Sequence, residues 1–323
     1  MSDKCRIFID GGEGTTGLRI LERFDKRDDV ELLKIDSGLR KDADERRKFI
    51  NSSDITFLCL PDAAAIEAVD LVDKDNDHTV IIDASTAHRT LPDWAYGLPE
   101  LSGDYREKIK KSRRIAVPGC YASGFNMIAY PLIKSGIVGC DYPFYATALS
   151  GYSGAGKKAI ALYEGEDKST DLYAPREYAL SQMHKHLKEM KAIPGLAHEP
   201  LFTPVVDDYY SGMIVSVPLY TRLFEKRVSV ADIRDMYAAH YDGEAFIKVR
   251  EFGYEKNEEL NGFLSANAFS GRDDAEIIIT GNEDRVLVSA RFDNLGKGAS
   301  GAAIQCMNIK LGVPEDTGLL IRS

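Results

Sequence analysis

The sequence predicts an α/β protein, with a Rossmann-like doubly wound parallel sheet followed by a second, α+β domain whose sheet is mostly antiparallel. Three observations indicate this arrangement. Short apolar runs alternate with helical patterns early in the chain, a glycine-rich segment joins the first run to the first helical pattern, and segments after residue 141 alternate in polarity. With 323 residues, the chain suits one large or two medium domains.

The first domain is expected to alternate strands and helices. Apolar strands are predicted at 6–9, 30–35, 55–60, 79–83 and 115–117. Helical spacing of apolar residues predicts helices at 18–24, 42–50, 63–72 and 123–133, with a short charged helix at 105–111. Residues 92–99 contain two prolines and a glycine and are expected to form a loop.

The second domain is expected to be built on half-exposed strands. They are predicted at 144–148, 214–219, 245–249, 275–280 and 285–292. The last helix, at 299–311, is apolar and rich in small residues, which suits packing against the first domain. We therefore expect one domain at residues 1–118 and 297–323 and the other at 119–296.

Composition limits the classes of partner and compartment. The chain carries 41 Lys and Arg against 51 Asp and Glu, a net charge of −10, which disfavours nucleic acid as a partner. It has no apolar run near the roughly 20 residues that cross a bilayer, so no membrane partner is expected. Its 5 cysteines show no CxxC spacing, which favours neither a disulfide framework nor a zinc site. A cytoplasmic protein is expected.

The glycine-rich segment Gly12-x-Gly14-x-x-Gly17 fits the dinucleotide fingerprint between a strand and a helix. The alternative is a plain glycine-rich turn, but the flanking elements favour a nucleotide. Asp36, at the end of the second strand, favours NAD, whereas Arg40 is suited to the 2′-phosphate of NADP. The residues alone leave this choice even. The expected cofactor-binding set here is Gly12, Gly14, Thr15, Thr16, Gly17 and Arg40.

Cys120 is the candidate nucleophile because it follows Pro118-Gly119 and precedes a helix. A helix N-terminus lowers the pKa of a thiol, and the thiolate is the reactive form. A thiolate beside a nicotinamide suggests that an acyl group forms a thioester, which hydride then reduces to an aldehyde. Burial as a small hydrophobe remains the alternative for Cys120, and it is the expectation for Cys5, Cys59, Cys140 and Cys306.

The only histidine cluster is His184-Lys185-His186. A histidine suits proton transfer near neutral pH. The alternatives are an exposed HxH segment, slightly favoured on the sequence alone, and a metal site. No third ligand has suitable spacing, so no metal is predicted.

Five sequence blocks resemble those of the N-acetyl-γ-glutamyl-phosphate reductases. Single blocks are shared with aspartate-semialdehyde dehydrogenases, but the set is more specific, and the chain is similar to the shorter of the family's two sequence types. The blocks are Asp-Ala-Ser-Thr-Ala-His-Arg at 83–89, Trp-Ala-Tyr-Gly-Leu-Pro-Glu-Leu at 94–101, Val-Pro-Gly-Cys-Tyr-Ala-Ser-Gly at 117–124, Ser-Gly-Tyr-Ser-Gly-Ala-Gly-Lys at 150–157, and Asp-Asn-Leu-Gly-Lys-Gly-Ala-Ser-Gly at 293–301.

The resemblance implies an oxidoreductase of arginine biosynthesis that uses NADPH to reduce N-acetyl-γ-glutamyl phosphate to the 5-semialdehyde, releasing phosphate. It places Cys120 as the nucleophile that forms the thioester. It places His186 or His184 as the acid/base, and we favour His186. Longer members carry His-Arg-His-x-Pro-Glu there, where this chain has His-Lys-His-Leu-Lys-Glu at 184–189, so the choice between the two histidines stays open.

The resemblance also implies the remaining site residues and the assembly. Arg89 is expected to bind the substrate phosphate, and the family's cofactor favours NADP over NAD. Residues 1–118 and 297–323 would bind NADP, and 119–296 would carry catalysis, substrate binding and oligomerisation as a homodimer or homotetramer. Further cofactor contacts are expected from Ser85, Ser153, Gly154 and Asn294.

Two other readings of the sequence remain. The substrate could be a related small acyl phosphate, either aspartyl phosphate or a carrier-bound aminoadipyl phosphate. The chain could instead be a nucleotide-binding regulator without catalysis.

Overall fold

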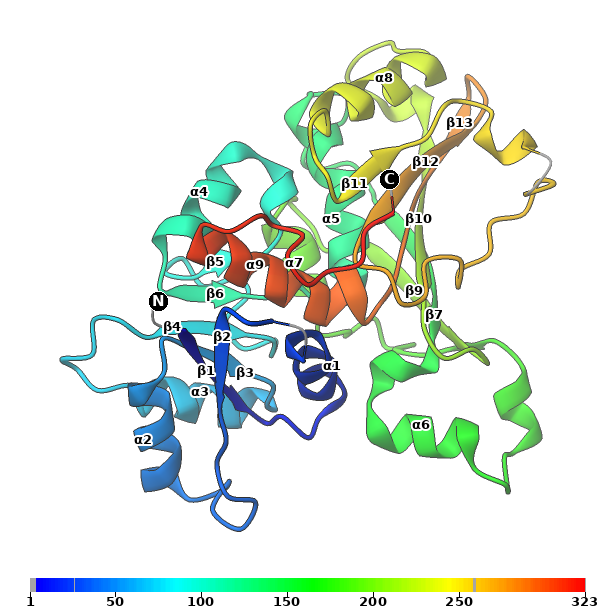
Figure 1. The fold of residues 1–323 in the computed structure, drawn as a ribbon. Helices are drawn as coiled ribbons and strands as arrows, with labels where there is room; N and C mark the ends of the chain where they lie inside the picture. The colour runs from blue at the N-terminus through cyan, green and yellow to red at the C-terminus, as the bar shows by residue number, and fades with distance from the viewer. Residues whose placement is uncertain (1–3, 26, 258–259, 323) are drawn as a thin grey trace. The chain divides into compact units, whose positions relative to one another are not determined.

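The computed structural model describes residues 4–25, 27–257 and 260–322, drawn in Figure 1. The chain separates into two compact units. The first unit comprises Met1–Pro118 and Ala299–Leu319, and the second comprises Gly119–Gly298 and Leu320–Ser323.

The first unit is built on a six-stranded sheet in the order β2-β1-β3-β4-β6-β5. Every neighbouring pair is parallel, which confirms the predicted doubly wound sheet. The two-residue strand β5 lies inside the segment predicted as a loop, because so short a strand leaves no apolar run to detect. The strands are β1 Cys5–Asp10, β2 Val30–Leu33, β3 Ile55–Leu58, β4 Val80–Asp83, β5 Ala95–Tyr96 and β6 Arg114–Ala116.

Helices cover both faces of this sheet (Figure 1). Ile7 of β1 packs into one apolar core with residues of α1 Thr15–Phe24, α4 Gly103–Lys111 and α9 Gly301–Leu311. Its neighbour Phe8 packs into a second core with residues of α2 Ala43–Ser52 and α3 Asp62–Asp70. Successive strand residues point to opposite faces, so the two cores flank the sheet.

The second unit is built on a seven-stranded sheet in the order β11-β12-β13-β10-β7-β9-β8. The pairs β11–β12 and β7–β9 are parallel and the rest are antiparallel, as expected for a mostly antiparallel sheet. The sequence reading missed β8 and β9, and β9 contains Pro204, which argues against a strand. The strands are β7 Tyr145–Gly151, β8 Arg176–Glu177, β9 Leu201–Asp207, β10 Met213–Tyr220, β11 Ile247–Val249, β12 Ala275–Gly281 and β13 Arg285–Phe292.

Two helices pack on this sheet, α5 Cys120–Lys134 against β10 and β13, and α8 Val230–His240 against β12. Pro131 inside α5 has no N–H, so the carbonyl of Met127 loses its helical donor. The hydroxyl of Tyr241 donates to that carbonyl at 2.7 Å. The hydroxyl of Tyr237 in α8 likewise donates to the carbonyl of Ile128, at 2.7 Å. Tyrosines at and just beyond α8 therefore hold the proline-containing turn of α5.

Helix α5 begins at Cys120, whereas the sequence predicted a start near residue 123. The Pro-Gly pair before it made the boundary appear later than it is. Three helices of the second unit were not predicted: α8, α6 Lys157–Glu164 and α7 Leu187–Ala192.

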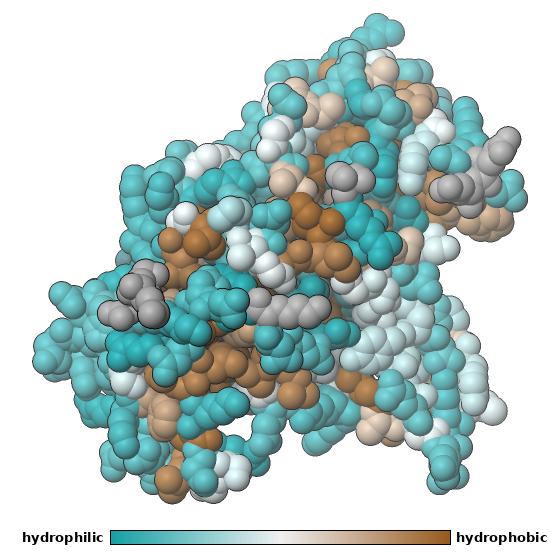
Figure 2. Space-filling view, in the orientation of Figure 1, coloured by the Kyte–Doolittle hydropathy of each residue, from teal (hydrophilic) through white to brown (hydrophobic). Residues whose placement is uncertain are grey.

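The surface over α4 is mainly hydrophilic (Figure 2). Among the described residues, none of the helices is both long and apolar enough to span a membrane.

Candidate active site

Cys120 is the first residue of α5, a helix of 15 residues with no acidic side chain in its first turn. The first N–H groups of a helix lack intrahelical acceptors and carry partial positive charge, which favours the thiolate. Cys120 is partly exposed. Its thiol is therefore both reachable and placed where a helix stabilises its anion.

The other cysteines lie in different surroundings. Burial, with help from nearby carboxylates, raises the pKa of Cys5 and of Cys59 to about 12. Cys306 has no exposed surface. Cys140 is exposed, at the surface of the second unit. The contrast supports Cys120 as the nucleophile.

The structure brings both predicted histidines into contact with Tyr121, the residue next to Cys120. The Tyr121 ring centroid lies 5.6 Å from that of His184 and 5.9 Å from that of His186. The two imidazole centroids are 4.6 Å apart at 85°. The hydroxyl of Tyr178 donates to that of Tyr121 at 2.8 Å. Cys120 thus stands at the edge of a cluster of four rings.

The two histidines differ in exposure and bonding. His186 is 5% exposed, whereas His184 is half-buried. The main-chain N–H of His186 donates to Nδ1 of His184 at 3.2 Å. When neutral, His184 therefore carries its proton on Nε2.

Two tyrosine hydroxyls in this cluster stay protonated. Burial raises the pKa of Tyr121 well above its usual value, and the neighbouring Tyr178 and Cys120 add to the shift. Burial likewise raises the pKa of Tyr178. The sequence reading missed both tyrosines, because only the fold brings residue 178 next to residue 121.

Glu189 is a second missed residue. It lies on α7, directly after the histidine segment, and is 1% exposed. Its Oε2 accepts the N–H of Gly119 at 3.1 Å. One carboxylate thus connects the segment that carries His186 to the residue before Cys120. The sequence signal was only its spacing within the histidine block.

Gly298 completes the surroundings of the thiol. A Cβ added at Gly298 would lie 2.8 Å from Cβ of Cys120, closer than carbon atoms approach. Gly298 belongs to the closing sequence block, and its missing side chain leaves the space that Cys120 occupies.

Three predicted cofactor residues of the second unit also lie together. Nδ2 of Asn294 donates to Oγ of Ser153 at 3.1 Å. A Cβ added at Gly154 would lie 3.0 Å from Nδ2 of Asn294. The N–H of Gly212 donates to Oδ1 of Asn294 at 2.8 Å, which fixes the amide orientation.

In the first unit, the glycine loop forms a cradle before α1. Gly11 has φ +83°, and a Cβ there would lie 2.4 Å from the carbonyl oxygen of Cys59. A Cβ at Gly17 would lie 2.7 Å from Cα of Gly12. Helix α1 has Gly14 as N-cap, with no side-chain cap and no acidic residue in its first turn. The loop therefore fits a pyrophosphate, and Gly11, which the fingerprint omitted, makes its tightest turn.

Each of the two residues expected to read the ribose already has a partner in the first unit. The guanidinium of Arg40 forms an ion pair with Glu13, which lies between Gly12 and Gly14 of the segment. Oδ1 of Asp36 accepts the N–H of Gly38 at 2.8 Å. Asp36 is thus partly committed to its own turn.

Ser85 and Arg89 are built into the loop after β4. The hydroxyl of Ser85 donates to Oδ2 of Asp83 at 2.6 Å. Nε of Arg89 donates to the carbonyl of Val117 at 2.9 Å, and Nη2 donates to that of Ala84 at 3.2 Å. Both predicted site residues therefore have structural bonds.

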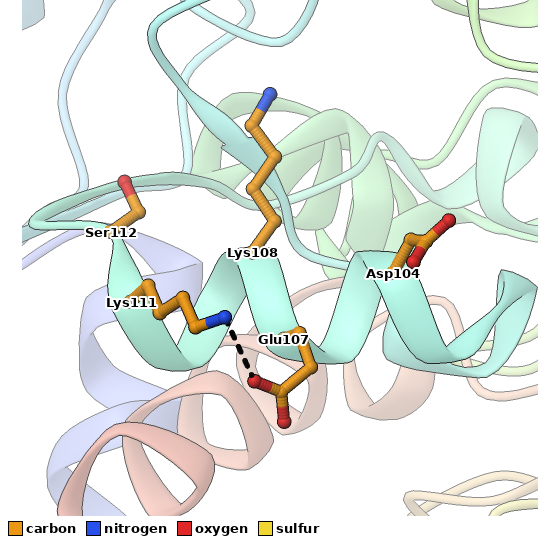
Figure 3. Close-up of a pocket in the computed structure, with 5 residues that line it drawn as sticks. All are labelled: Asp104, Glu107, Lys108, Lys111 and Ser112. Carbon is orange, nitrogen blue, oxygen red and sulfur yellow. Dashed lines mark ion pairs between the residues drawn. The ribbon is translucent and has the colours of Figure 1, made fainter.

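A hollow on the surface of α4 has a volume of about 470 Å³ (Figure 3). Lys111 pairs with Glu107, one turn earlier on the same helix, at 3.4 Å (Figure 3). The hollow is lined by Asp104, Glu107, Lys108, Lys111 and Ser112. None of these residues was predicted to act in catalysis or binding.

These features define a dehydrogenase class: a glycine loop on a parallel sheet in one unit, and a cysteine at a helix N-terminus in the other. Residues 34–112 match the family model described as semialdehyde dehydrogenase, NAD binding domain. Residues 120–294 match the model described as semialdehyde dehydrogenase, dimerisation domain.

Curated relatives and solved structures agree with these matches. A protein of Nostoc sp. named N-acetyl-gamma-glutamyl-phosphate reductase 2 is 45% identical over 98% of this chain and 100% of its own. One from Brucella ovis, named N-acetyl-gamma-glutamyl-phosphate reductase, is 42% identical over 96% and 99%. Aspartate semialdehyde dehydrogenase II of Vibrio cholerae shares the fold, with a TM-score of 0.71 and 16% identity over 96% and 99%.

The chain belongs to the semialdehyde dehydrogenase family, and within it to the N-acetyl-γ-glutamyl-phosphate reductases.

Proposed function

We propose that the protein is an NADPH-dependent oxidoreductase that reduces N-acetyl-γ-glutamyl phosphate to N-acetylglutamate 5-semialdehyde, releasing phosphate, in arginine biosynthesis. The observation that carries the proposal is Cys120 at the N-terminus of α5, flanked by both histidines and by Gly298. The names of the relatives supply the substrate.

The first step is acyl transfer to Cys120. The thiolate attacks the acyl carbon, the C–O bond to phosphate breaks, and a thioester forms. We assign stabilisation of the developing oxyanion to N–H groups in the first turn of α5, and losing one such donor typically costs about 2.7–4 kcal/mol of barrier. Phosphate is a good leaving group, so positioning and charge stabilisation are the main demands on the protein.

The second step reduces the bound acyl group. NADPH supplies the hydride. Hydride addition gives a thiohemiacetal oxyanion, which takes a proton from an acid and returns it to the same residue as the C–S bond breaks. That cleavage releases the aldehyde and restores the thiolate. We assign that proton transfer to His186, with His184 as the alternative, because both rings contact Tyr121 next to the thiol.

The cofactor assignment uses both units. In the first unit we assign pyrophosphate binding to Gly12, Gly14 and Gly17, together with Thr15 and Thr16, and the 2′-phosphate to Arg40. Asp36 has one carboxylate oxygen bonded to Gly38, which supports NADP over NAD. Further contacts are assigned to Ser85 in the first unit and to Ser153, Gly154 and Asn294 in the second.

We further propose that residues 1–118 and 297–323 form the NADP-binding domain and that 119–296 form the catalytic and oligomerisation domain. The match of residues 120–294 to a dimerisation-domain model supports a homo-oligomer, a dimer or a tetramer. We place the enzyme in the cytoplasm.

The test is oxidation in the reverse direction. The purified protein is expected to reduce NADP with N-acetylglutamate 5-semialdehyde, only when phosphate is present. Aspartate 4-semialdehyde is the competing substrate. A higher kcat/KM for aspartate 4-semialdehyde would refute the substrate assignment, and turnover without phosphate would refute the acyl-phosphate product.

A further inference from the structure

The chain that leads to the two histidines first runs along the edge of the second sheet. β8 pairs with β9 in an antiparallel register, and the N–H of Tyr178, directly after β8, donates to the carbonyl of Pro204 at 3.1 Å. The same register, continued by two residues, would place Leu180 in a hydrogen-bonded pair with Phe202. Leu180 is instead 74% exposed, because the chain turns away from β9 after Tyr178.

The turn that replaces the ladder has a strained backbone. The N–H of Gln182 donates to the carbonyl of Ala179 at 2.9 Å and closes the turn. In the part of the chain that the structure describes, three non-glycine residues have a positive φ, and two of them are Ala179 at +52° and Gln182 at +57°. Side chains other than glycine seldom adopt this left-handed region without support from their surroundings. Other contacts must therefore hold the turn in this conformation.

The side-chain amide of Gln182 supplies such contacts. Its Nε2 donates to the carbonyl of Phe202 at 2.8 Å, and its Oε1 accepts the N–H of Phe202 at 2.9 Å. The amide thus bonds the two main-chain groups that β8 would have bonded had its ladder continued. Gln182 has exposed surface, but both of these hydrogen bonds are partly buried.

Phe202 connects this amide to the histidines. Phe202 is 1% exposed, and its ring centroid lies 5.3 Å from that of His184 and 5.2 Å from that of Tyr121. The N–H of His186 in turn donates to Nδ1 of His184. All of these residues belong to the second unit. The amide of Gln182 therefore ties the chain that enters the histidine segment to the residue whose ring packs against His184.

We propose that Gln182 is a positioning residue for His184 and His186, whose side-chain amide replaces the missing ladder bonds of β8 and holds the histidine segment on β9. The inference rests on the proposed function, since it concerns the acid/base of that reaction. It gives Gln182 an effect on kcat that requires no contact with substrate or cofactor.

The experiment compares Q182M and Q182G with the wild type. Methionine keeps the length of the side chain but has no amide. Glycine also lacks the amide, but it adopts a positive φ without strain, so it separates the loss of the hydrogen bonds from strain in the turn. The matched control is A179G, which adds a glycine to the same turn and leaves Gln182 intact.

Three quantities are measured for each protein. They are kcat and KM for NADP with N-acetylglutamate 5-semialdehyde, thermal unfolding, and the rate at which diethyl pyrocarbonate modifies each histidine, resolved by peptide mass. His186 is 5% exposed, so its modification in the wild type is expected to be slow. His198 is exposed in the same unit and serves as the internal reference.

We expect kcat of both Gln182 variants to fall about 10- to 100-fold, with KM for NADP within about twofold of the wild-type value. Modification of His186 should accelerate about fivefold or more, because the histidine segment opens locally, whereas the rate at His198 should not change. A179G should match the wild type in kcat and in both modification rates.

Several results would overturn the proposal. One is a folded Q182G with wild-type kcat and an unchanged rate at His186. Equal acceleration at His186 and His198, or a lower unfolding temperature with wild-type kcat, would show that Gln182 serves only general stability. The same conclusion would follow if both Gln182 variants failed to fold beside a folded A179G, or if A179G lost as much activity as Q182G. If Q182M alone fails to fold, Q182G decides.

Failure of the proposed function is separate from failure of this inference. A wild type that oxidises neither N-acetylglutamate 5-semialdehyde nor aspartate 4-semialdehyde refutes the function. The modification rates need no turnover, and an unchanged rate at His186 in Q182M and Q182G would still overturn the positioning role.

Discussion

The close approach of Gly298 to Cys120 allows a sharp test of the candidate site. Substituting Gly298 by Ala adds one methyl group whose carbon would lie 2.8 Å from Cβ of Cys120 and 3.3 Å from Cε2 of Phe292. Optimal carbon–carbon contacts lie at about 3.5–4.0 Å. Cys120 and the new methyl group must therefore move apart by about 1 Å.

That displacement predicts a large effect on rate and a smaller one on stability. A misplacement of about 1 Å can cost about 100-fold in rate, so kcat of G298A is expected to fall about 10- to 100-fold. Overpacking typically destabilises a protein by about 1–3 kcal/mol. The affinity for NADPH is expected to change much less than kcat, because the added methyl group displaces Cys120.

The assay measures kcat and KM with N-acetylglutamate 5-semialdehyde, NADPH affinity by fluorescence, and thermal unfolding. The matched control is G103A, since an added Cβ at Gly103 meets nothing within 4 Å. G298A with a wild-type kcat would show that Cys120 does not need its present position, and the reasoning would fail.

Three further predictions concern single side chains. Cys120→Ser is expected to abolish turnover while NADPH still binds, measured by steady-state rates and fluorescence titration. His186→Asn is expected to lower kcat about 100- to 10,000-fold, and His184→Asn less, with the pH profile of kcat losing its histidine limb only in the first. Glu13→Gln is expected to tighten NADPH binding about two- to fivefold. Arg40 must leave its ion pair with Glu13 to bind the 2′-phosphate, and breaking an exposed ion pair costs only a small free energy. Arg40→Met should reduce the affinity for NADPH to that for NADH.

Each of these has its own control or contrary outcome. Cys140→Ser, at an exposed cysteine, should retain wild-type activity, and a wild-type rate in C120S would refute the thioester route. A larger loss in H184N than in H186N would reverse the histidine assignment. Weaker NADPH binding in E13Q would mean that Glu13 orients Arg40 for the 2′-phosphate rather than competing with it. High salt should narrow the difference between E13Q and wild type, since the pair is exposed.

Much of the first unit could be predicted because its strands are buried on both faces. Ile55–Leu58 reads as one apolar run, and the helices between strands show their own period. β9 was missed for the opposite reason, since its burial is uneven and Pro204 interrupts it. β8 has two exposed residues and exists only because β9 offers it an edge.

The candidate site was predictable where one residue carries its own chemistry. Cys120 and the two histidines stood out by type and local context. Tyr178, Glu189 and Gly298 did not, because their roles depend on contacts across long stretches of sequence. A glycine whose value is the space it leaves beside a distant cysteine has no local signature.

The way the chain returns to its first unit at α9 has a consequence for biosynthesis. Ala302, Ala303 and Met307 of α9 share an apolar core with Ile7 of β1, and Asn308 accepts a hydrogen bond from Arg27 at 2.8 Å. The part of the first unit that is made first on the ribosome therefore lacks one of the helices that cover its sheet until α9 emerges. The second unit has nearly all its residues once Gly298 has been synthesised. We therefore expect the second unit to complete its fold during translation before the first unit does.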